Sequence, residues 1–249
     1  MKRLAWIVAA ALALGACSKD NPRQLQGWVE ADMVFVSPDE AGRIETLNVR
    51  EGDKVAKGEL LFAVDDDLQK ADQVVRKAAV TNAEQTFERA KQLLQSSAGT
   101  QKNYDDAEAA LRQTRANLAA AETRLQRRRV YSPADGSIQQ VYFRVGETVP
   151  AGRGVVALLP PQNLKIRFFA PQAMLPTIRI GETVAVSCDG CEPNLTAKVN
   201  FISLSAEFTP PVIYSLEERA KLVFLIEARP DAPDKFRVGQ PVSVTLPNG

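Results

Sequence analysis

The sequence predicts an α+β protein with an elongated, multidomain chain. We expect a β unit split in two, an antiparallel α-helical coiled-coil hairpin inserted between its halves, and an antiparallel β-barrel. Three observations predict this. A short β pattern occurs twice, a long segment with one glycine and no proline separates the copies, and the last third alternates apolar runs with turn residues. With 249 residues, 45% of them apolar, the chain can form more than one core.

The β pattern is a repeat. Its first copy runs from Ser37 to Phe62 and its second from Ser132 to Val156. Successive glycines stand ten and six residues apart in both copies: Gly42, Gly52 and Gly58, then Gly136, Gly146 and Gly152. Agreement at so many positions indicates one folding unit divided into halves. We therefore predict a single β domain built from residues 37–65 and 131–160.

Residues 66–130 form the predicted hairpin. Three acids, Asp65 to Asp67, are expected to cap the first helix, and three arginines, Arg127 to Arg129, to end the second, because these charges suit the two ends of a helix dipole. The break between the helices falls at residues 96–100. Each arm of about thirty residues reaches about 45 Å.

Both predicted helices carry an apolar stripe at the three-four spacing of a coiled coil. In the second helix the stripe is Tyr104, Ala107, Leu111, Thr114, Leu118, Ala121 and Leu125. In the first helix it is Val75, Ala79, Ala83, Thr86, Ala90 and Leu93. Two helices that bury only a narrow stripe on each other gain little stability from being this long. The length therefore favours a hairpin that reaches a distant partner over a solvated helical pair that binds no partner.

The first residues form a targeting segment. A charged start, Lys2 and Arg3, precedes an apolar run from Leu4 to Leu14 that is too short to span a bilayer. The following Gly15-Ala16-Cys17 completes a pattern that resembles the lipobox of bacterial lipoproteins. This resemblance implies removal of a signal peptide, residues 1–16, and lipid attachment at Cys17. A simple signal peptide with an incidental cysteine is the alternative.

Residues 17–27 would then link the lipid to the folded chain. We expect a periplasmic protein that is lipid-anchored to the inner membrane. Ser18 leaves the outer membrane open, because a residue other than Asp after the cysteine favours sorting there. Lys19 weakens that inference, since later positions also affect sorting.

Cys188 and Cys191 flank Asp189-Gly190, directly after the alternating strand expected at residues 183–187. A two-residue hairpin turn would bring the two thiols close enough for a disulfide in an oxidising compartment. A thioredoxin-like redox site is less favoured, because that motif opens a helix. A metal site would need two further ligands.

The composition argues against most enzyme classes. Histidine is absent, which removes the commonest general base and metal ligand. A net charge of +1 at pH 7 suggests no nucleic-acid partner. We predict no catalytic residues, no metal and no cofactor.

The last third predicts a small antiparallel barrel or sandwich. Apolar runs between turn residues predict strands at 164–170, 183–187, 195–204, 222–228 and 242–246, with a short helix within 171–180. A further strand at residues 28–36 lies outside the repeat and is expected to complete the barrel. The barrel domain would thus comprise residues 28–36 and 161–249.

The split repeat, with its Gly-x-Ile and Val-x-x-Gly elements, resembles the two halves of a lipoyl or biotinyl domain. In carriers of that fold a lysine on the turn between the halves takes the cofactor, whereas here Asp65-Asp66-Asp67 leads into a helix. A swinging-arm carrier is therefore a poor alternative. The order lipobox, half domain, hairpin, half domain, barrel resembles the periplasmic adaptor family, also called membrane fusion proteins or the HlyD family. The resemblance covers essentially the whole mature chain.

The predicted hairpin tip carries a second resemblance. Arg89-x3-Leu93-x6-Thr100 is similar to the family's signature for docking a TolC-type outer-membrane channel, with Thr in place of Ser, and Tyr104-Asp105 also fits. Arg89 and Leu93 lie one turn apart on one helix face. The resemblance implies that Arg89, Leu93 and Thr100 dock the channel. The alternative is a solvated Arg89 and a Leu93 that ends the stripe of the first helix.

The barrel segment Ser203–Pro210, followed by Leu222-Val223-Phe224, resembles the YbhG-like branch of the family, whose members partner ABC-type exporters. The chain ends soon after the strand expected at 242–246, which leaves little for the membrane-proximal domain of adaptors for RND pumps. We therefore expect an ABC-type inner-membrane partner and, less so, an RND pump. Residues 207–211 are expected to form an ordered loop or an ordinary turn.

The resemblance implies the periplasmic adaptor subunit of a tripartite efflux or secretion system, which links an inner-membrane exporter to a TolC-like outer-membrane channel. A homo-oligomeric ring, six subunits by family resemblance, would present the hairpin tips together. The alternative is a structural or regulatory envelope lipoprotein whose hairpin binds another partner.

Overall fold

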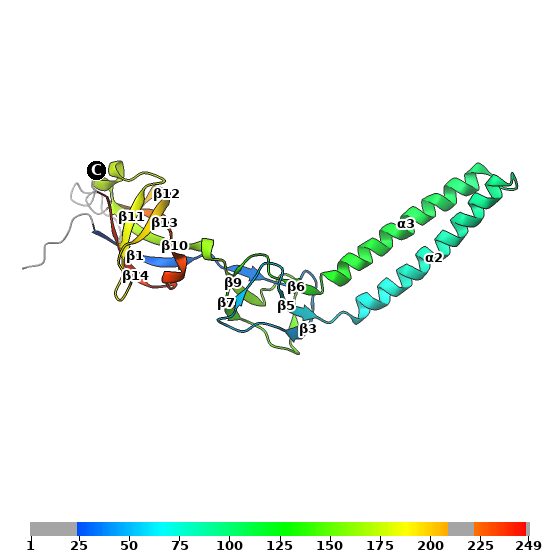
Figure 1. Ribbon diagram of the computed structural model, residues 1–249, viewed down its shortest axis with the longest axis horizontal. Coiled ribbons are helices and arrows are strands. Elements are labelled where there is room, and N and C mark those ends of the chain that lie inside the picture. Colours follow the sequence, from blue (N-terminus) through cyan, green and yellow to red (C-terminus); the bar gives the residue numbers. More distant parts are fainter. Residues whose placement is uncertain (1–23, 209–221, 248–249) are drawn as a thin grey trace, which may run out of the picture. The chain divides into compact units, whose positions relative to one another are not determined.

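A computed structural model describes residues 24–208 and 222–247 (Figure 1). Its helices and antiparallel sheets confirm the α+β class. The chain divides into two compact units, one of Met33–Pro160 and one of Met1–Asp32 with Pro161–Gly249. The predicted signal peptide, Cys17 and residues 209–211 of the expected loop lie outside the described residues.

The first unit contains two four-stranded sheets that correspond strand by strand. One sheet has the order β2 (Val34–Val36), β9 (Val156–Leu159), β7 (Gly136–Val141) and β4 (Lys54–Val55). The other has the order β6 (Arg129–Tyr131), β5 (Leu60–Val64), β3 (Gly42–Leu47) and β8 (Thr148–Val149). Each sheet combines strands from both copies of the repeat. Neither copy can therefore form its sheet alone.

The two copies exchange the same backbone hydrogen bonds. Gly52 N–H donates to Ile138 C=O at 2.8 Å, and Gly146 N–H donates to Ile44 C=O at 2.8 Å. Ile44 and Ile138 are both buried in a core that also contains Leu61, Phe62, Val149 and Leu158. The turn of each half thus closes on the first strand of the other half, so the two halves interlock.

The turns that make this exchange share one construction. Gly52 and Gly146 have φ of 92° and 93°, a left-handed conformation that glycine adopts at no steric cost. The carboxylates of Asp53 and Glu147 accept the backbone N–H three residues earlier, at 2.7 and 2.9 Å. The barrel uses the same turn at residues 179–182 and 237–240, with Glu182 and Gln240 as acceptors.

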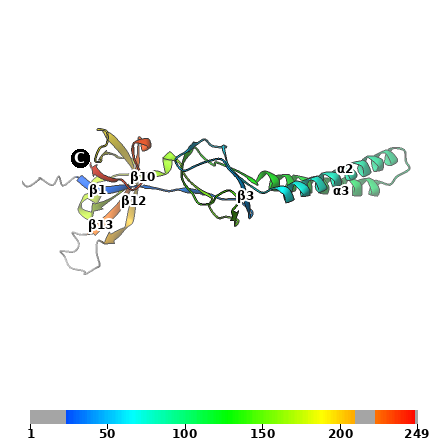
Figure 2. The ribbon, with the colours of Figure 1, turned by 90° about the horizontal axis from the view of Figure 1, so that it is seen from below.

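Two long helices, α2 (Asp67–Gln95) and α3 (Gln101–Gln126), lie side by side and antiparallel (Figure 2). The predicted stripe of the second helix is confirmed: Ala107, Leu111 and Ala121 are buried and its other members are partly buried. The break at residues 96–100 is also where the sequence places it. The second helix ends earlier than expected, because Arg129 and Val130 join strand β6.

The predicted stripe of the first helix is wrong at four of its six positions, and at three of them the buried residue is the next one along the chain. Val75, Ala79, Thr86 and Leu93 are exposed, whereas Val80, Phe87 and Leu94 face the second helix together with Ala83 and Ala90. Phe87 packs on Tyr104 with ring centroids 5.3 Å apart. Phe87 buries more apolar area than Thr86 would, and Val80 more than Ala79, which favours this rotation of the helix.

The three acids at the start of the hairpin do not cap it as expected. Asp66 is the N-cap residue but makes no side-chain cap hydrogen bond. Its carboxylate pairs with Lys70 instead, and Asp65 Oδ1 accepts the Arg43 backbone N–H at 2.8 Å. Only Asp67 lies in the first helical turn. Tertiary partners thus outcompete local capping for two of the three carboxylates.

The second unit is a closed six-stranded barrel. Its strand order is β1 (Gln24–Ala31), β10 (Leu164–Pro171), β13 (Leu222–Pro230), β12 (Leu195–Phe208), β11 (Thr183–Ser187) and β14 (Pro241–Thr245). Residues 172–177 form a short 3₁₀ helix. Inward side chains such as Val29, Phe168 and Val244 are fully buried and fill the barrel.

The single strand expected at residues 28–36 is wrong. Residues 24–31 form barrel strand β1, and Val34–Val36 form β2, which pairs with β9 of the first unit. Val29 is buried in the barrel, whereas Phe35 is exposed. The alternation of apolar residues continues through Asp32 and Met33 although the pairing partner changes there, so periodicity alone does not reveal the boundary.

An ion-pair network crosses three strands of the barrel. Lys165 lies 3.0 Å from Asp32 and 3.2 Å from Glu227, and Arg167 contacts Glu30 at 2.6 Å and Glu227 at 3.3 Å. Partial burial alone lowers the pKa of Lys165, but hydrogen bonds to Asp32 and Glu227 outweigh it, so the pKa is raised above its ordinary 10.5. Protonated Lys165 therefore stabilises the folded barrel.

Lys165→Met should lower the free energy of unfolding of the barrel at neutral pH. The difference in this free energy between wild type and variant should shrink as the pH rises through the folded-state pKa of Lys165, which lies above 10.5. The raised pKa means that the wild-type contribution is complete below 10.5 and is lost at higher pH. Urea unfolding followed by the fluorescence of Trp28, which packs on Phe169, measures it. Lys198→Met, an exposed lysine of β12, is the control. A deficit equal at neutral and strongly alkaline pH would contradict the assignment.

Candidate functional site

The hairpin is attached to neighbouring strands of one sheet. β5 ends at Val64 just before α2, and β6 begins at Arg129 just after α3; the two strands pair with Ala63 opposite Arg129. Val64 N–H donates to Arg128 C=O at 2.9 Å. The two feet are thus fixed side by side, and the closed β unit determines where the hairpin starts.

Arginines of the second foot tie it to the loop before β3. Arg128 is buried, and its Nη1 donates to Ala41 C=O at 3.0 Å, while Arg127 pairs with Asp39 at 3.2 Å. Gly42 lies against this cluster: a Cβ there would be 2.6 Å from Asp65 Oδ1 and 3.1 Å from Arg128 Nη1. Gly42 is required for this close approach, which the glycine spacing of the repeat does not by itself explain.

The tip loop, residues 96–100, is held by carbonyls of the last turn of α2, those of Gln92, Leu93 and Leu94. Leu93 C=O accepts the N–H of both Ala98 and Gly99 at 2.9 Å, and Ser97 adopts a left-handed φ of 58°. A Cβ on Gly99 would lie 3.1 Å from the Leu93 backbone. These bonds satisfy carbonyl and amide groups that the helix end leaves free. The backbone of Leu93 is therefore locked.

The side chain of Leu93 is about half exposed. It is 49% exposed and lies outside the contact between the helices, where Leu94 packs instead. Arg89 is also exposed, and its guanidinium donates to Thr86 Oγ1 at 3.1 Å. An apolar side chain and a cation thus face outward one turn apart on α2. The alternative that Leu93 ends the buried stripe is wrong.

Thr100 is the N-cap of α3. Its backbone is extended and its Oγ1 accepts the Asn103 N–H at 3.2 Å. The structure therefore gives this residue a capping role that any hydroxyl at the position would fill. The side chain is exposed, so the same hydroxyl lies at the surface of the tip with Leu93.

Two residues of the tip were missed by sequence reasoning. Phe87, which packs on Tyr104, and Leu94 lie on the less exposed side of α2, so that Arg89 and Leu93 face outward. The seven-residue spacing of Val80, Phe87 and Leu94 in the sequence is the pattern that indicates this buried side.

Cys188 and Cys191 are joined by a disulfide, with Cα atoms 5.3 Å apart. They bracket a tight turn in which Cys191 N–H donates to Cys188 C=O at 3.1 Å and Gly190 has a φ of 76°. The expected two-residue hairpin is nevertheless wrong: the strands pair only from Val186 and Leu195 outward, so the loop is longer. The disulfide closes a turn within that loop.

Residues 24–208 and 222–247 contain neither a cluster of potential metal ligands nor a helix long and apolar enough to cross a bilayer.

A split β sandwich that carries a long helical hairpin, in a chain that also contains a small barrel, defines the class of membrane fusion proteins, or periplasmic adaptors. The family described as RND MFP, barrel-sandwich hybrid domain, matches residues 32–159. The match covers just over half of the 249 residues, and the chain belongs to this family. Its members are periplasmic adaptors that oligomerise and work with inner-membrane transporters and outer-membrane channels.

Several proteins are similar over nearly the whole chain. A UPF0194 membrane protein of Acidithiobacillus ferridurans is 28% identical, over 97% of this chain and 93% of the relative. A UPF0194 membrane protein of Citrobacter koseri is 25% identical, over 96% and 94%.

Solved structures share the fold at lower identity. The membrane fusion protein Spr0693 of Streptococcus pneumoniae R6 superposes with a TM-score of 0.69 at 19% identity, over 91% of this chain and 100% of that one. A MacA–MexA chimera with the Pseudomonas aeruginosa MexA α-hairpin gives a TM-score of 0.70 at 21% identity, over 89% and 78%.

Thr100→Ala should loosen the first turn of α3, because it removes the acceptor for the Asn103 amide. Loss of such a cap costs about 1 kcal/mol, so amide exchange at the start of α3 should accelerate roughly fivefold. Thr100→Ser keeps the hydroxyl and should exchange like the wild type. Hydrogen exchange resolved to residues 101–104 measures this, and equal rates for the Ala and Ser variants would refute the capping role.

The exported protein should contain no reactive thiol at Cys188 or Cys191. Alkylation of the denatured protein before and after reduction, read by mass spectrometry, should show both cysteines labelled only after reduction. Labelling of both before reduction would show that the turn is reduced in the cell.

Proposed function

We propose that this chain is the adaptor of a tripartite efflux or secretion system and links an inner-membrane exporter to a TolC-like outer-membrane channel through its hairpin tip. Arg89, Leu93 and Thr100 form the docking surface. One observation carries the proposal: Leu93, whose carbonyl holds the tip loop, has a side chain that is about half exposed at the end of a long hairpin. The exposed half leaves an apolar surface free for a partner.

The tip suits a contact that is repeated around a ring. Each tip offers one leucine, one arginine and one hydroxyl, which is a small surface. A homo-oligomer, taken as a hexamer, would present many such contacts at once, so a weak contact would suffice for stable docking. Closure of the β unit fixes the hairpin feet and favours equal presentation of all tips.

For the inner-membrane partner we propose an ABC-type exporter. Support comes from the resemblance of Ser203–Pro210 to the YbhG-like branch. The matching family is described by its RND members, so an RND pump is the second candidate. Co-purification after mild cross-linking, with mass spectrometry of the captured membrane proteins, distinguishes them. Recovery of an RND pump without an ABC exporter would overturn this part.

We further propose that residues 1–16 are removed and that acylated Cys17 anchors the protein in the inner membrane facing the periplasm. Substitution Cys17→Ser should release the protein from the membrane fraction. Intact mass of the membrane-extracted protein should show acyl chains on residue 17. An unmodified cysteine would contradict the anchor.

Leu93→Asp and Arg89→Glu should each abolish cross-linking to the outer-membrane channel and abolish export. The first places a charge in the apolar contact, and the second reverses the charge one turn away. Both side chains are exposed, so helix content and unfolding temperature should not change.

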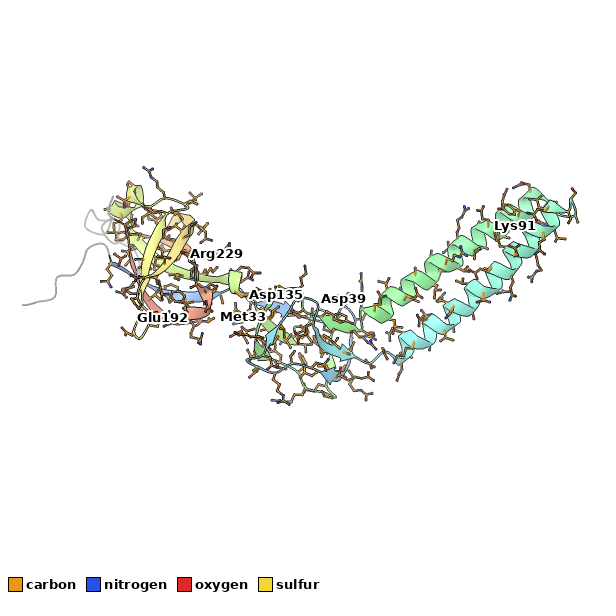
Figure 3. The ribbon with its side chains drawn as sticks, viewed as in Figure 1. Met33, Asp39, Lys91, Asp135, Glu192 and Arg229 are labelled. Atoms are coloured by element: carbon orange, nitrogen blue, oxygen red, sulfur yellow. A yellow bond between two sulfur atoms is a disulfide. The ribbon has the colours of Figure 1, made fainter. Side chains whose placement is uncertain are left out.

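Two matched controls separate docking from general effects on the hairpin. Val75→Asp adds the same charge at another exposed apolar position of α2. Lys91→Glu reverses an exposed charge near the tip (Figure 3). Both controls should export normally. If the Leu93 and Arg89 variants also export normally, the tip is not the docking surface.

A further inference from the structure

The two ends of the barrel differ in charge. Strands β1 and β11 begin, and strand β14 ends, at the same end of the barrel, because Gln24 and Ala185 both pair with Thr245. We call this the Leu204 end. The segments there, 24–26, 171–178, 202–206 and 245–247, contain no charged residue, and Arg179, Glu182 and Glu207 are the charges that adjoin them in the described chain. The ion pairs of Lys165, Arg167 and Lys235 lie toward the other end.

Leu204 is fully exposed at the apex of a large β-bulge. β12 pairs with β13 up to Ile202–Ile226 and resumes at Ala206–Phe224, so residues 203–205 stand opposite the single residue Leu225. Ser203 Oγ closes the bulge by donating to Ser205 C=O at 2.9 Å and accepting its N–H at 3.1 Å. The exposed fraction of Leu204 is 100%, so the bulge presents an apolar side chain with nothing of the described chain covering it.

A second apolar side chain is exposed at this end. Ile180 is 69% exposed at the tip of the turn before β11. Phe201, which is 45% exposed on β12, pairs with Glu227 and so lies beside the ion pairs. Gly181 N–H donates to Val199 C=O at 2.7 Å, which holds that turn beside the β12 segment carrying Phe201. Glu182, one of the few charges nearby, accepts the Arg179 backbone N–H and is thereby engaged in the turn.

The chain also limits how far this end can lie from the bilayer. β1 begins at Gln24, seven residues after Cys17. Seven extended residues span about 25 Å at most. If Cys17 carries the lipid, the Leu204 end is the part of the barrel that the anchor holds next to the membrane.

We propose that the Leu204 end rests on the bilayer, with Leu204 and Ile180 in the interfacial region. The occupant of this surface is lipid: the described rim has few charges, which suits the headgroup layer, and an exposed leucine and isoleucine gain by leaving water for the acyl boundary. The inference rests on the proposed anchor at Cys17. It gives the barrel a role in fixing how the adaptor stands on the membrane.

Tryptophan fluorescence tests the contact. The sequence has two tryptophans, Trp6 and Trp28, so Trp6→Phe with Trp28→Phe gives a background without any. In it, Leu204→Trp reports on the proposed contact, and Val238→Trp, which replaces an exposed valine at the other end of the barrel, is the matched control. The acylated protein is placed in phosphatidylethanolamine–phosphatidylglycerol vesicles containing lipids brominated on the acyl chain.

Emission from the Leu204→Trp variant should be quenched at least about twofold and that from the Val238→Trp variant hardly at all, since an indole at the interface lies within reach of the upper acyl chain. No quenching of the Leu204→Trp variant, or equal quenching of both, would overturn the proposal. Sedimentation of the wild-type protein with the vesicles tests the anchor separately. If the wild-type protein does not sediment with the vesicles, Cys17 can be coupled to a maleimide lipid that supplies the tether. The quenching experiment then still tests whether Leu204 contacts the bilayer.

A second arm distinguishes lipid from a protein partner. A photo-crosslinking amino acid at position 204 in cells should give lipid adducts, which appear as small mass additions. A discrete adduct with a membrane protein would replace the lipid contact by a contact with that protein and overturn the proposal.

Discussion

The rest of this structure depends on the closure of two half domains on each other. The hydrogen bonds between Gly52 and Ile138 and between Gly146 and Ile44 require both halves at once. The two halves are separated by a 65-residue insert. Because the entropic cost of closing a loop grows only slowly with loop length, such a long insert is compatible with a stable β unit. Closure places β5 beside β6, so α2 starts and α3 ends at neighbouring strands.

The tip depends on a rotation of α2 by a single residue position. With Phe87 and Leu94 on the buried side, Leu93 faces solvent and Arg89 lies one turn before it on the same face. A helix rotated to bury Thr86 and Leu93 would have a smaller contact and would turn Leu94 outward in place of Leu93. The packing of Phe87 on Tyr104 therefore stabilises the hairpin and determines what it presents.

The barrel carries its ion pairs and its exposed leucine at different places. The ion pairs link three strands, and the Leu204 bulge lies beyond them where β12 approaches its end. The network between Lys165, Glu227 and Arg167 is partly buried, so removal of one partner would leave a costly unpaired charge. The described residues thus hold three surfaces with different chemistry: a charged hairpin foot, an apolar and cationic tip, and a barrel end with an exposed leucine and few charges.

The architecture of this protein follows from local patterns in its sequence. Glycine spacing revealed the divided unit, the absence of proline and the break at residues 96–100 revealed two helices, and alternating runs located most barrel strands. These patterns reflect local backbone preferences, which do not depend on how the elements later pack. Three other points depended on tertiary contacts: the face of α2 that is buried, the partners of Asp65 and Asp66, and the boundary between β1 and β2. Each involves competition between alternatives of similar local propensity. Which leucine packs, which amide a carboxylate meets and which strand a segment joins are settled by contacts between residues distant in the chain.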